Sequence, residues 1–430
     1  MIVRPLVDQE RIIRELEALA EFSDTPKPAI TRILFTKPDL EARAYLKSLC
    51  EEAGLSLRED GLGNIFARWE GSAPDLPAVG TGSHFDAIPY AGMYDGTVGV
   101  LGGLEAIRSL QRSGFKPYRS IELLIFTAEE PTRFGVGCLG SRALAGVLSP
   151  DSLRQLKDQE GRSLEEVRWE AGYMGRLEDV QLPQGYYSAF VELHIEQGPL
   201  LEQERVPLGI VTAIAAPAAL RVNLEGEGGH AGTVLMPDRR DALCAAAEII
   251  LGVEAFAKNS GSINTVATTG FCEVYPNAVN SVPSRVKLEI DIRDVDQSRR
   301  DQVIRNVIQG VEQVCTRREI KYSVDIINVD PPAKAGSEVL KALVASCGEA
   351  GVKFKLMVSR AYHDSLFMAR IAPTAMLFIP CRGGVSHRPD EYASPEDIAR
   401  GTYVLALTLA KLSLAEDKTV SKEDPVLLDD

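Results

Sequence analysis

All five histidines of the chain occur where a side chain could take part in chemistry. They are His84, His194, His230, His363 and His387, and each is in or near a Gly-rich turn or the end of an apolar run. A single histidine in such a place is more often structural than catalytic. Five of five, with none inside an apolar helical face, favours a functional centre built from imidazoles, which bind divalent metals and transfer protons near neutral pH.

Carboxylates accompany these histidines. Asp86 is two residues after His84, and residues i and i+2 of a strand share a face, so Asp86 could hold the second ring nitrogen of a metal-bound imidazole. Glu129 and Glu130 end an apolar run just before Pro131. Paired acids are costly to bury unless a cation neutralises them, so one could bind a metal while the other transfers protons. The alternative is a solvated loop with two acids.

The combined donors predict a metal site. The candidate ligands are His84, Asp95, Glu130, His194 and His387. Nitrogen and carboxylate ligands without thiolate suit zinc and manganese alike. Five ligands suffice for two ions if one carboxylate bridges them and water completes the coordination. The seven cysteines are scattered and never closely paired, which favours free thiols in a reducing compartment over a disulfide framework or a thiolate zinc site. A lone nucleophilic cysteine is the alternative.

Alternating strands and helices must position these side chains. A chain of 430 residues is too long for one ordinary core, so two domains are expected. Short apolar runs predict buried strands over residues 78–87, 120–130 and 189–198. Helical periodicity occurs over residues 8–22, 39–54 and 98–114. This alternation predicts an α/β fold whose mostly parallel sheet is covered by helices on both faces.

The pattern changes between residues 214 and 329. There the order is strand, helix, two strands, helix and strand, a β-α-β-β-α-β unit that forms a compact domain. The earlier pattern then returns, so residues 1–213 and 330–430 are predicted to form one discontinuous large domain with the small domain inserted. The polar, acidic residues 414–430 are predicted to form a loose tail.

The overall charge limits the partners. A net charge of −14 without a basic stripe argues against nucleic acid and anionic membranes. No apolar run reaches the length of a membrane span and the N-terminal residues lack a signal-peptide core, so a cytoplasmic location is expected. An anionic substrate would need a local arginine. Arg293, on the polar face of the alternating stretch "VKLEIDIRD", could bind a carboxylate or pair with a neighbouring Asp.

Seven motifs carry a resemblance to a known family. In chain order they are "GSHFDAIPYAGMYDG", "FTAEEPTRFGVGCLGSRALAG", "ELHIEQGPLLE", "GGHAG", "NAVNSVPSRVKLEIDIRD", "AYHDSLFMA" and "GGVSHRPDEY". Together they resemble the dinuclear-metal amidohydrolases that act on N-carbamoyl-L-amino acids, allantoate and ureidoglycolate, which are relatives of the aminoacylase metallopeptidases. The motifs are spread over most of the chain.

The resemblance implies a role for each residue. The implied metal ligands are His84, Asp95, Glu130, His194 and His387, with Asp95 as the bridge. Glu129 matches the catalytic base, and His230, flanked by glycines, is the candidate donor to the oxyanion. The implied substrate contacts are His230, Asn280 and Arg293 from the small domain and Gln197, Gly383 and Gly384 from the large one. His363 and Asp364 are expected to support the ligands from behind, as is Asp86. A cis peptide bond is expected between Asp95 and Gly96.

The implied activity is hydrolysis of the ureido C–N bond of a small anionic substrate. Ureidoglycolate, cleaved to glyoxylate, ammonia and carbon dioxide, is the expected substrate, with N-carbamoyl-L-amino acids or allantoate as alternatives. An aminopeptidase and a catalytically silent binding protein are further alternatives. The resemblance also implies two divalent ions per subunit, manganese with zinc as the alternative. It implies a homodimer joined through the small domain, in which His230 enters the partner's site.

Overall fold

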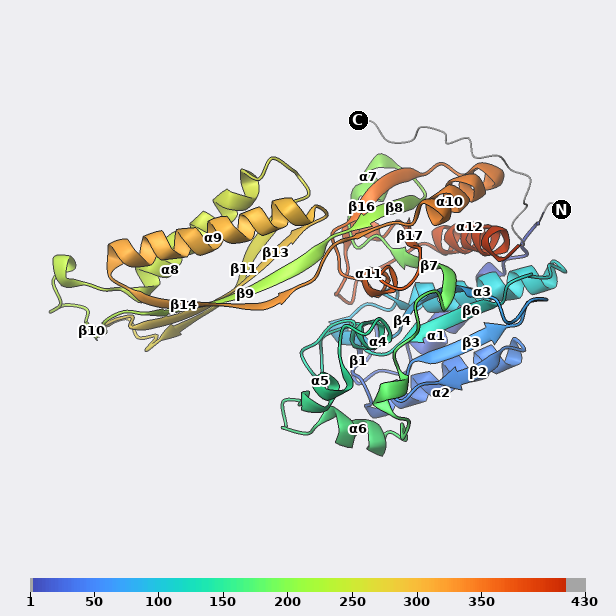
Figure 1. The fold of residues 1–430 in the computed structure, drawn as a ribbon, viewed down its shortest axis with the longest axis horizontal. Helices are drawn as coiled ribbons and strands as arrows, with labels where there is room; N and C mark the ends of the chain where they lie inside the picture. Colours follow the sequence, from blue (N-terminus) through green and yellow to red (C-terminus); the bar gives the residue numbers. More distant parts are fainter. Residues whose placement is uncertain (1–2, 415–430) are drawn as a thin grey trace.

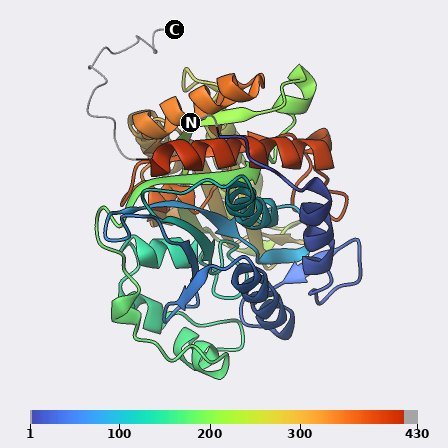
Figure 2. The same cartoon turned by 90° about the vertical axis from the view of Figure 1, so that its right-hand side faces the viewer.

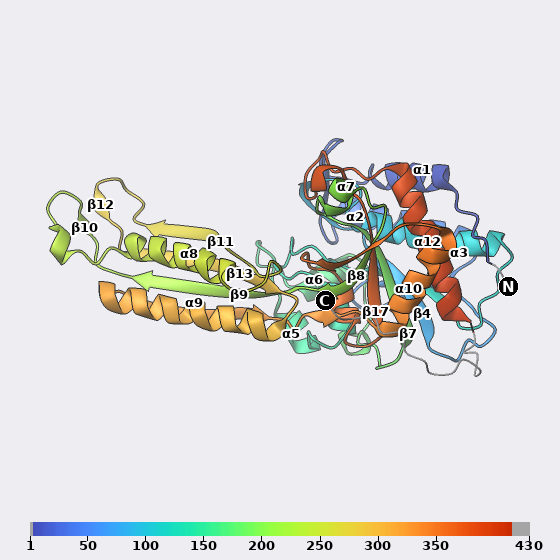
Figure 3. The same cartoon turned by 90° about the horizontal axis from the view of Figure 1, so that it is seen from above.

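The computed structural model describes residues 3–414. A large α/β lobe carries an elongated smaller lobe that projects from one side (Figures 1 and 3). Residues 415–430, which make up almost all of the predicted acidic tail, lie outside the described range. Within residues 3–414, no helix combines the length and apolar character that a membrane span requires.

A nine-stranded sheet forms the centre of the large lobe, and its strand order is β15-β8-β17-β7-β4-β6-β3-β2, with β16 beside β8. Its four central strands are parallel: β4 (Ala78–His84), β6 (Ile121–Phe126), β7 (Tyr187–Ile195) and β17 (Thr374–Ile379). The remaining strands are β2 (Ser56–Glu59), β3 (Ile65–Trp69), β8 (Gly209–Ile214), β15 (Ala333–Lys334) and β16 (Lys355–Ser359). The predicted α/β fold is confirmed, but the sheet is mixed, because β2, β3, β8 and β15 pair antiparallel and only β16 adds another parallel pair.

Helices cover both faces of this sheet (Figure 2). Alternate residues of β6 enter different cores: Ile121, Leu123 and Ile125 face one, whereas Leu124 and Phe126 face the other. The first core is closed by α1 (Gln9–Leu19), α2 (Lys37–Glu52), α3 (Thr97–Arg112), α10 (Ser337–Ala350) and α12 (Pro395–Ser413). The second contains α4 (Leu139–Leu144), α5 (Pro150–Gln155) and α6 (Leu164–Glu170). Strands buried on both faces are mostly apolar, and the sequence therefore shows β6 and β7 as apolar runs, each interrupted by one buried glutamate, Glu122 or Glu192.

The smaller lobe has a core of its own. Its four antiparallel strands, in the order β11-β13-β9-β14, are β9 (Ala216–Glu225), β11 (Val266–Tyr275), β13 (Arg285–Asp294) and β14 (Lys321–Val329). Two helices pack on this sheet, α8 (Ala242–Lys258) and α9 (Gln297–Arg318). The predicted order of strands and helices is confirmed. The sequence did not predict the short pair β10 (Gly229–His230) and β12 (Ser281–Val282), which lies at the far tip (Figure 3).

Shorter elements complete the chain. They are β1 (Ile30–Arg32), β5 (Ala87–Ala91), α7 (Leu200–Glu204), α11 (Ser365–Met368) and the 3-10 helices η1 (Leu177–Asp179), η2 (Met236–Asp238) and η3 (Arg382–Gly384). The two segments that join the lobes lie side by side, because Asp330 N–H donates to the Pro217 carbonyl. The buried guanidinium of Arg300 on α9 also donates to the Ala216 and Asp330 carbonyls. The small lobe is therefore held to the large one at a narrow base.

Candidate metal centre

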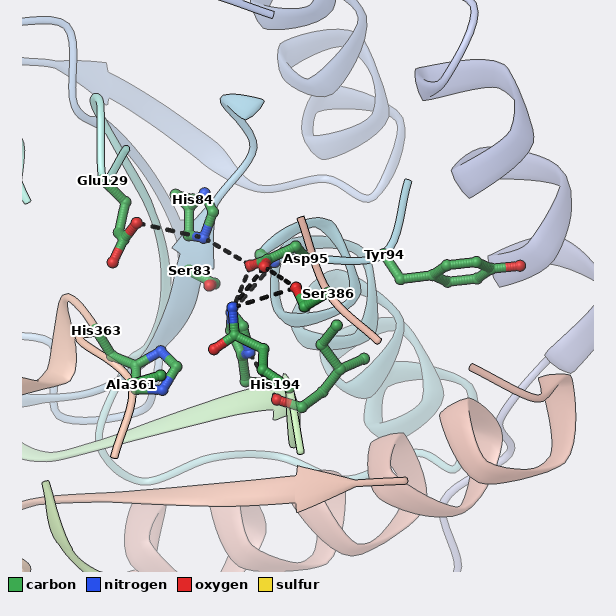
Figure 4. A network of polar contacts seen from close by, with 12 residues as sticks. Ser83, His84, Tyr94, Asp95, Glu129, His194, Ala361, His363 and Ser386 are labelled. Carbon is green, nitrogen blue, oxygen red and sulfur yellow. Dashed lines mark hydrogen bonds and ion pairs between the residues drawn. The ribbon is translucent and has the colours of Figure 1, made fainter. Parts of the chain in front are cut away.

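The predicted ligands meet at the carboxyl ends of the central parallel strands. His84 ends β4, His194 is near the end of β7, and Asp95 precedes α3 (Figure 4). Asp95 Oδ1 lies 3.3 Å from His84 Nε2 and 3.2 Å from His194 Nε2. All three side chains are buried. One ligand atom from each residue lies within 4.8 Å of the others, so the three could hold one cation.

A second group of three shares Asp95. His387 Nε2 lies 3.4 Å from Asp95 Oδ2 and 3.1 Å from Glu130 Oε1. Asp95 thus turns one oxygen toward each group, which is the arrangement of a bridging carboxylate. The His387 side chain is 46% exposed, so the centre is open to solvent on that side.

Local backbone conformation brings these side chains together. Gly96 has φ +67°, and a Cβ there would lie 2.5 Å from His84 Nε2, so only glycine lets the Asp95 segment approach so closely. The expected cis peptide bond after Asp95 is not present: within residues 3–414 the cis bonds precede Pro28 and Pro276. Instead, the positive φ of Gly96 and its lack of a side chain allow the close approach.

Asp86 connects two ligand-bearing segments. Its carboxylate accepts the backbone N–H groups of Glu129 at 3.1 Å and Glu130 at 3.0 Å. Asp86 Oδ1 also lies 3.4 Å from His84 Nδ1, the position that the strand periodicity predicts. Ala128, at φ +52°, turns the chain after β6 so that both glutamates reach the centre.

The electrostatics suit divalent cations. Burial alone would raise the pKa of Asp95, but hydrogen bonds from His194, His387 and His84 hold it well below its usual range. Asp95 and Glu130 raise the pKa of His387 to about 10. Without a cation, protonated imidazoles would balance the buried carboxylates, and a bound metal ion would take the place of these protons. The two groups contain nitrogen and carboxylate donors without thiolate, and they share the Asp95 carboxylate. Such donors fit divalent metal ions.

Glu129 belongs to neither group of ligands. Its Oε2 lies 4.0 Å from His84 Nε2 (Figure 4), and its Oε1 accepts a hydrogen bond from Cys138 Sγ at 3.5 Å. Burial raises the pKa of Glu129 well above its usual range, although the nearby His84 opposes this, and Glu130 adds to the rise. A buried carboxyl with a raised pKa beside a cation site is suited to proton transfer.

His363 and Asp364 lie behind the ligands. The His363 ring packs edge-on against His194, with ring centroids 4.6 Å apart, and its Nε2 contacts Ser359 Oγ at 3.0 Å. Burial lowers the pKa of His363 well below its usual range, and His194 adds to this. The Ser141 hydroxyl donates to Asp364 Oδ1, while the buried Asp364 Oδ2 has no hydrogen-bond partner among residues 3–414.

Three predicted substrate contacts from the large lobe are engaged within the chain. Gln197 Nε2 donates to Asp95 Oδ2 at 2.5 Å, and within the described part of the chain its buried Oε1 has no hydrogen-bond partner. Gly383 N–H donates to Glu202 Oε2 at 2.6 Å. Gly384 has φ +65°, and a Cβ there would lie 2.5 Å from the Pro199 nitrogen. The structure therefore gives Gly384 a packing role, whereas Gly383 is exposed and contributes its backbone N–H.

The small lobe separates its three predicted contacts. Arg293 lies at the base, where it donates to Asp291 Oδ1 at 2.7 Å and to the Arg360 carbonyl of the large lobe at 3.3 Å. The exposed His230 and Asn280 are at the opposite tip, joined by the bond from Ala231 N–H to the Asn280 carbonyl (Figure 1). One chain therefore does not bring His230 and Asn280 to its own centre.

Two residues around Asp95 were missed in the sequence. Ser386 Oγ lies 2.7 Å from Asp95 Oδ2, and buried Glu391 accepts the backbone N–H of Asp95 at 3.0 Å. Both are in "GGVSHRPDEY", where Ser386 precedes His387 and Glu391 follows it by four residues. Both residues could have been found by inspecting the neighbours of the candidate ligand His387. A search for metal donors alone gives no reason to select them.

Comparisons with known proteins agree with this centre. Residues 80–411 match the model of peptidase family M20/M25/M40. Ureidoglycolate hydrolase of Arabidopsis thaliana is 53% identical over 95% of this chain and 87% of its own. N-carbamoyl-L-amino-acid amidohydrolase of Pseudomonas sp. (strain NS671) is 35% identical over 94% and 98%. A crystal structure of AtUAH in complex with glyoxylate superposes with a TM-score of 0.86 at 52% identity, covering 95% of this chain and 99% of that one. The chain, with its imidazole and carboxylate donors gathered on Asp95, belongs to the M20/M25/M40 peptidase family.

Proposed function

We propose that the protein hydrolyses ureidoglycolate to glyoxylate, ammonia and carbon dioxide. The observation that carries this proposal is the Asp95-centred pair of ligand groups with the free carboxyl of Glu129 beside it. The choice of substrate rests on similarity, since the relative named for ureidoglycolate is 53% identical and the one named for N-carbamoyl-L-amino acids is 35% identical. Hydrolysis of the latter compounds or of allantoate is the alternative.

The mechanism assigns separate tasks to the side chains. His84 and His194 would hold one divalent ion, Glu130 and His387 the other, with Asp95 between them; manganese is proposed and zinc is the alternative. When bound, such ions supply an acidified water and an electrophile for the ureido carbonyl. Glu129 would take the proton from the attacking water and return it to the departing ammonia, acting first as base and then as acid.

Arg293 is proposed to bind the substrate carboxylate. Its guanidinium lies at the base of the small lobe and contacts the large lobe through the Arg360 carbonyl. The Arg293 side chain is 31% exposed and forms an ion pair with Asp291. A bound substrate carboxylate would take the place of Asp291. A planar guanidinium can grip a carboxylate with two hydrogen bonds, and a lysine could not reproduce that geometry.

The two helices of the small lobe differ in a way that supports a homodimer. The outward side chains of α9 are polar and include Gln302, Arg305, Gln309 and Glu312. Those of α8 include the exposed pair Glu254 and Lys258 and also an apolar row with a spacing of four, Leu243, Ala247, Leu251 and Ala255. Helix α8 packs beside β11, which is an open edge of the small sheet. An apolar helix row next to the open side of an edge strand suits pairing with a second copy of the same surface.

Leu251→Glu is expected to convert the dimer into monomers and to remove most of the activity. Leu251 is 65% exposed in the single chain, and a charge buried at the centre of the interface should weaken association by at least about 2 kcal/mol, roughly 30-fold. Sedimentation velocity and ammonia release measure the two effects. Gln309→Glu, on the polar face of α9, is the matched control and should change neither. A dimeric Leu251→Glu protein would place the interface elsewhere.

The substrate is tested by ammonia release from ureidoglycolate, allantoate and several N-carbamoyl-L-amino acids. Chelator treatment should abolish turnover, and manganese should restore it better than zinc. Ureidoglycolate is expected to have the highest kcat/KM. If an N-carbamoyl-L-amino acid is turned over far faster, the substrate proposal is wrong but the proposed chemistry stands. Activity that survives full metal removal would contradict both.

A further inference from the structure

Glu391 lies behind the bridging carboxylate and is only 4% exposed. Its Oε1 accepts two backbone hydrogen bonds, from Tyr94 N–H at 2.9 Å and from Asp95 N–H at 3.0 Å. A Cβ at Gly92 would lie 2.3 Å from Glu391 Cβ, so the segment before Asp95 packs directly on this side chain. Glu391 therefore holds the main chain that carries Asp95.

The other oxygen of Glu391 reaches the Asp95 side chain through Ser386. Ser386 Oγ lies 2.8 Å from Glu391 Oε2. It also lies 2.7 Å from Asp95 Oδ2, and Figure 4 shows Ser386 beside Asp95. Ser386 is next to His387, a member of the second ligand group. The Glu391 carboxylate thus joins the segment that carries Asp95 to the segment that carries His387. Asp95 and Glu391 are 296 residues apart in the sequence.

We propose that Glu391 is a positioning residue that sets the orientation of Asp95 and holds the His387 segment against it; this inference rests on the proposed two-ion function. Without Glu391, the backbone N–H groups of Tyr94 and Asp95 lose their acceptor, and the Ser386 hydroxyl keeps only its contacts with Asp95 and Gln197. Asp95 could then rotate, so that its two oxygens no longer face separate ligand groups. Partners that orient metal ligands typically contribute about 10- to 100-fold to metal affinity.

The two ligand groups should not depend equally on Glu391. His84 and His194 are fixed by the central strands β4 and β7. His387 follows a 3-10 turn outside the sheet and has φ +58°, so its position depends on contacts such as those of Ser386. The ion held by Asp95, Glu130 and His387 is therefore expected to be lost first.

The experiment measures manganese stoichiometry and affinity, by chelator competition and elemental analysis, in the full-length protein. Glu391→Ala is expected to bind one ion about 10- to 100-fold more weakly and to retain the other. Glu391→Gln should stay close to the wild type, because its amide oxygen can accept both backbone N–H groups and its amide nitrogen can donate to Ser386 Oγ. Ser386→Ala removes the hydroxyl contacts with Asp95, Glu391 and Gln197 but keeps both backbone hydrogen bonds to Glu391. It should weaken the same ion less, and it provides the measurement if Glu391→Ala does not fold.

Asp60→Ala is the matched control. Asp60 likewise accepts two backbone N–H groups, from Leu62 at 2.9 Å and Asn64 at 3.0 Å, and one side-chain donor, the Asn64 amide. It contacts no residue of either ligand group, so its loss should leave both manganese affinities unchanged.

Three results would overturn the inference. They are wild-type affinities for both ions in Glu391→Ala, a Glu391→Gln protein as impaired as Glu391→Ala, or a loss of affinity in Asp60→Ala equal to that in Glu391→Ala. A wild-type protein that binds fewer than two ions would instead contradict the proposed two-ion centre, so the two failures can be told apart.

Discussion

Glu129→Gln is expected to lower kcat on ureidoglycolate by about 10²- to 10⁴-fold while leaving metal content and thermal stability close to those of the wild type. The amide has the size of the carboxyl but cannot accept the proton of the attacking water. Glu129 is outside both ligand groups, so its replacement removes no donor to a cation. Steady-state kinetics, elemental analysis and thermal melting of the same preparation separate these effects.

The neighbouring glutamate is the matched control. Glu130 Oε1 lies 3.1 Å from His387 Nε2 in the second ligand group. Glu130→Gln is therefore expected to lower the metal content, and its loss of activity should follow from that loss of metal. The pH profile gives a second check. Glu129 must be ionised to act as a base, and its pKa is raised, so kcat should fall as the pH decreases through that raised value. The residual activity of Glu129→Gln should lack this acid limb. If Glu129→Gln loses metal and Glu130→Gln keeps it, the two roles are reversed.

His230→Ala is expected to lower kcat by about 10²- to 10³-fold, the usual effect of removing one donor to an oxyanion. This loss is not obvious from one chain, because His230 is exposed at the tip of the small lobe (Figure 1). If His230 serves the partner's centre, mixing His230→Ala with Glu129→Gln should restore activity. Each mixed dimer then has one intact site, so an equal mixture should reach about a quarter of the wild-type activity per chain.

The mixing experiment needs proof that mixed dimers form. Two affinity tags allow the mixed dimer to be purified, and this pure species should have about half of the wild-type activity. Leu251→Glu in both chains should prevent any recovery. A purified mixed dimer that stays as inactive as its parents would show that His230 does not act across subunits.

The clustering of the candidate ligands could be predicted because most of them are next to a local signal. His84, Glu130 and His194 follow apolar runs, Pro131 marks the turn after Glu130, and Gly96 follows Asp95. The carboxyl ends of parallel strands lie at one edge of a sheet, so these residues had to approach one another wherever the strands were neighbours. The pairing of β4 with both β6 and β7 meets that condition.

What the sequence determined by itself was the fold class, the order of the elements and the donors, since each depends on periodicity or turn residues within a short stretch. The tertiary structure decided three further points. Strands β2, β3, β8 and β15 form antiparallel pairs, Glu391 and Ser386 meet Asp95 from the opposite end of the chain, and His230 lies far from its own centre. Each of these depends on which distant segments pack together, and that choice is made by the whole core rather than by any local pattern.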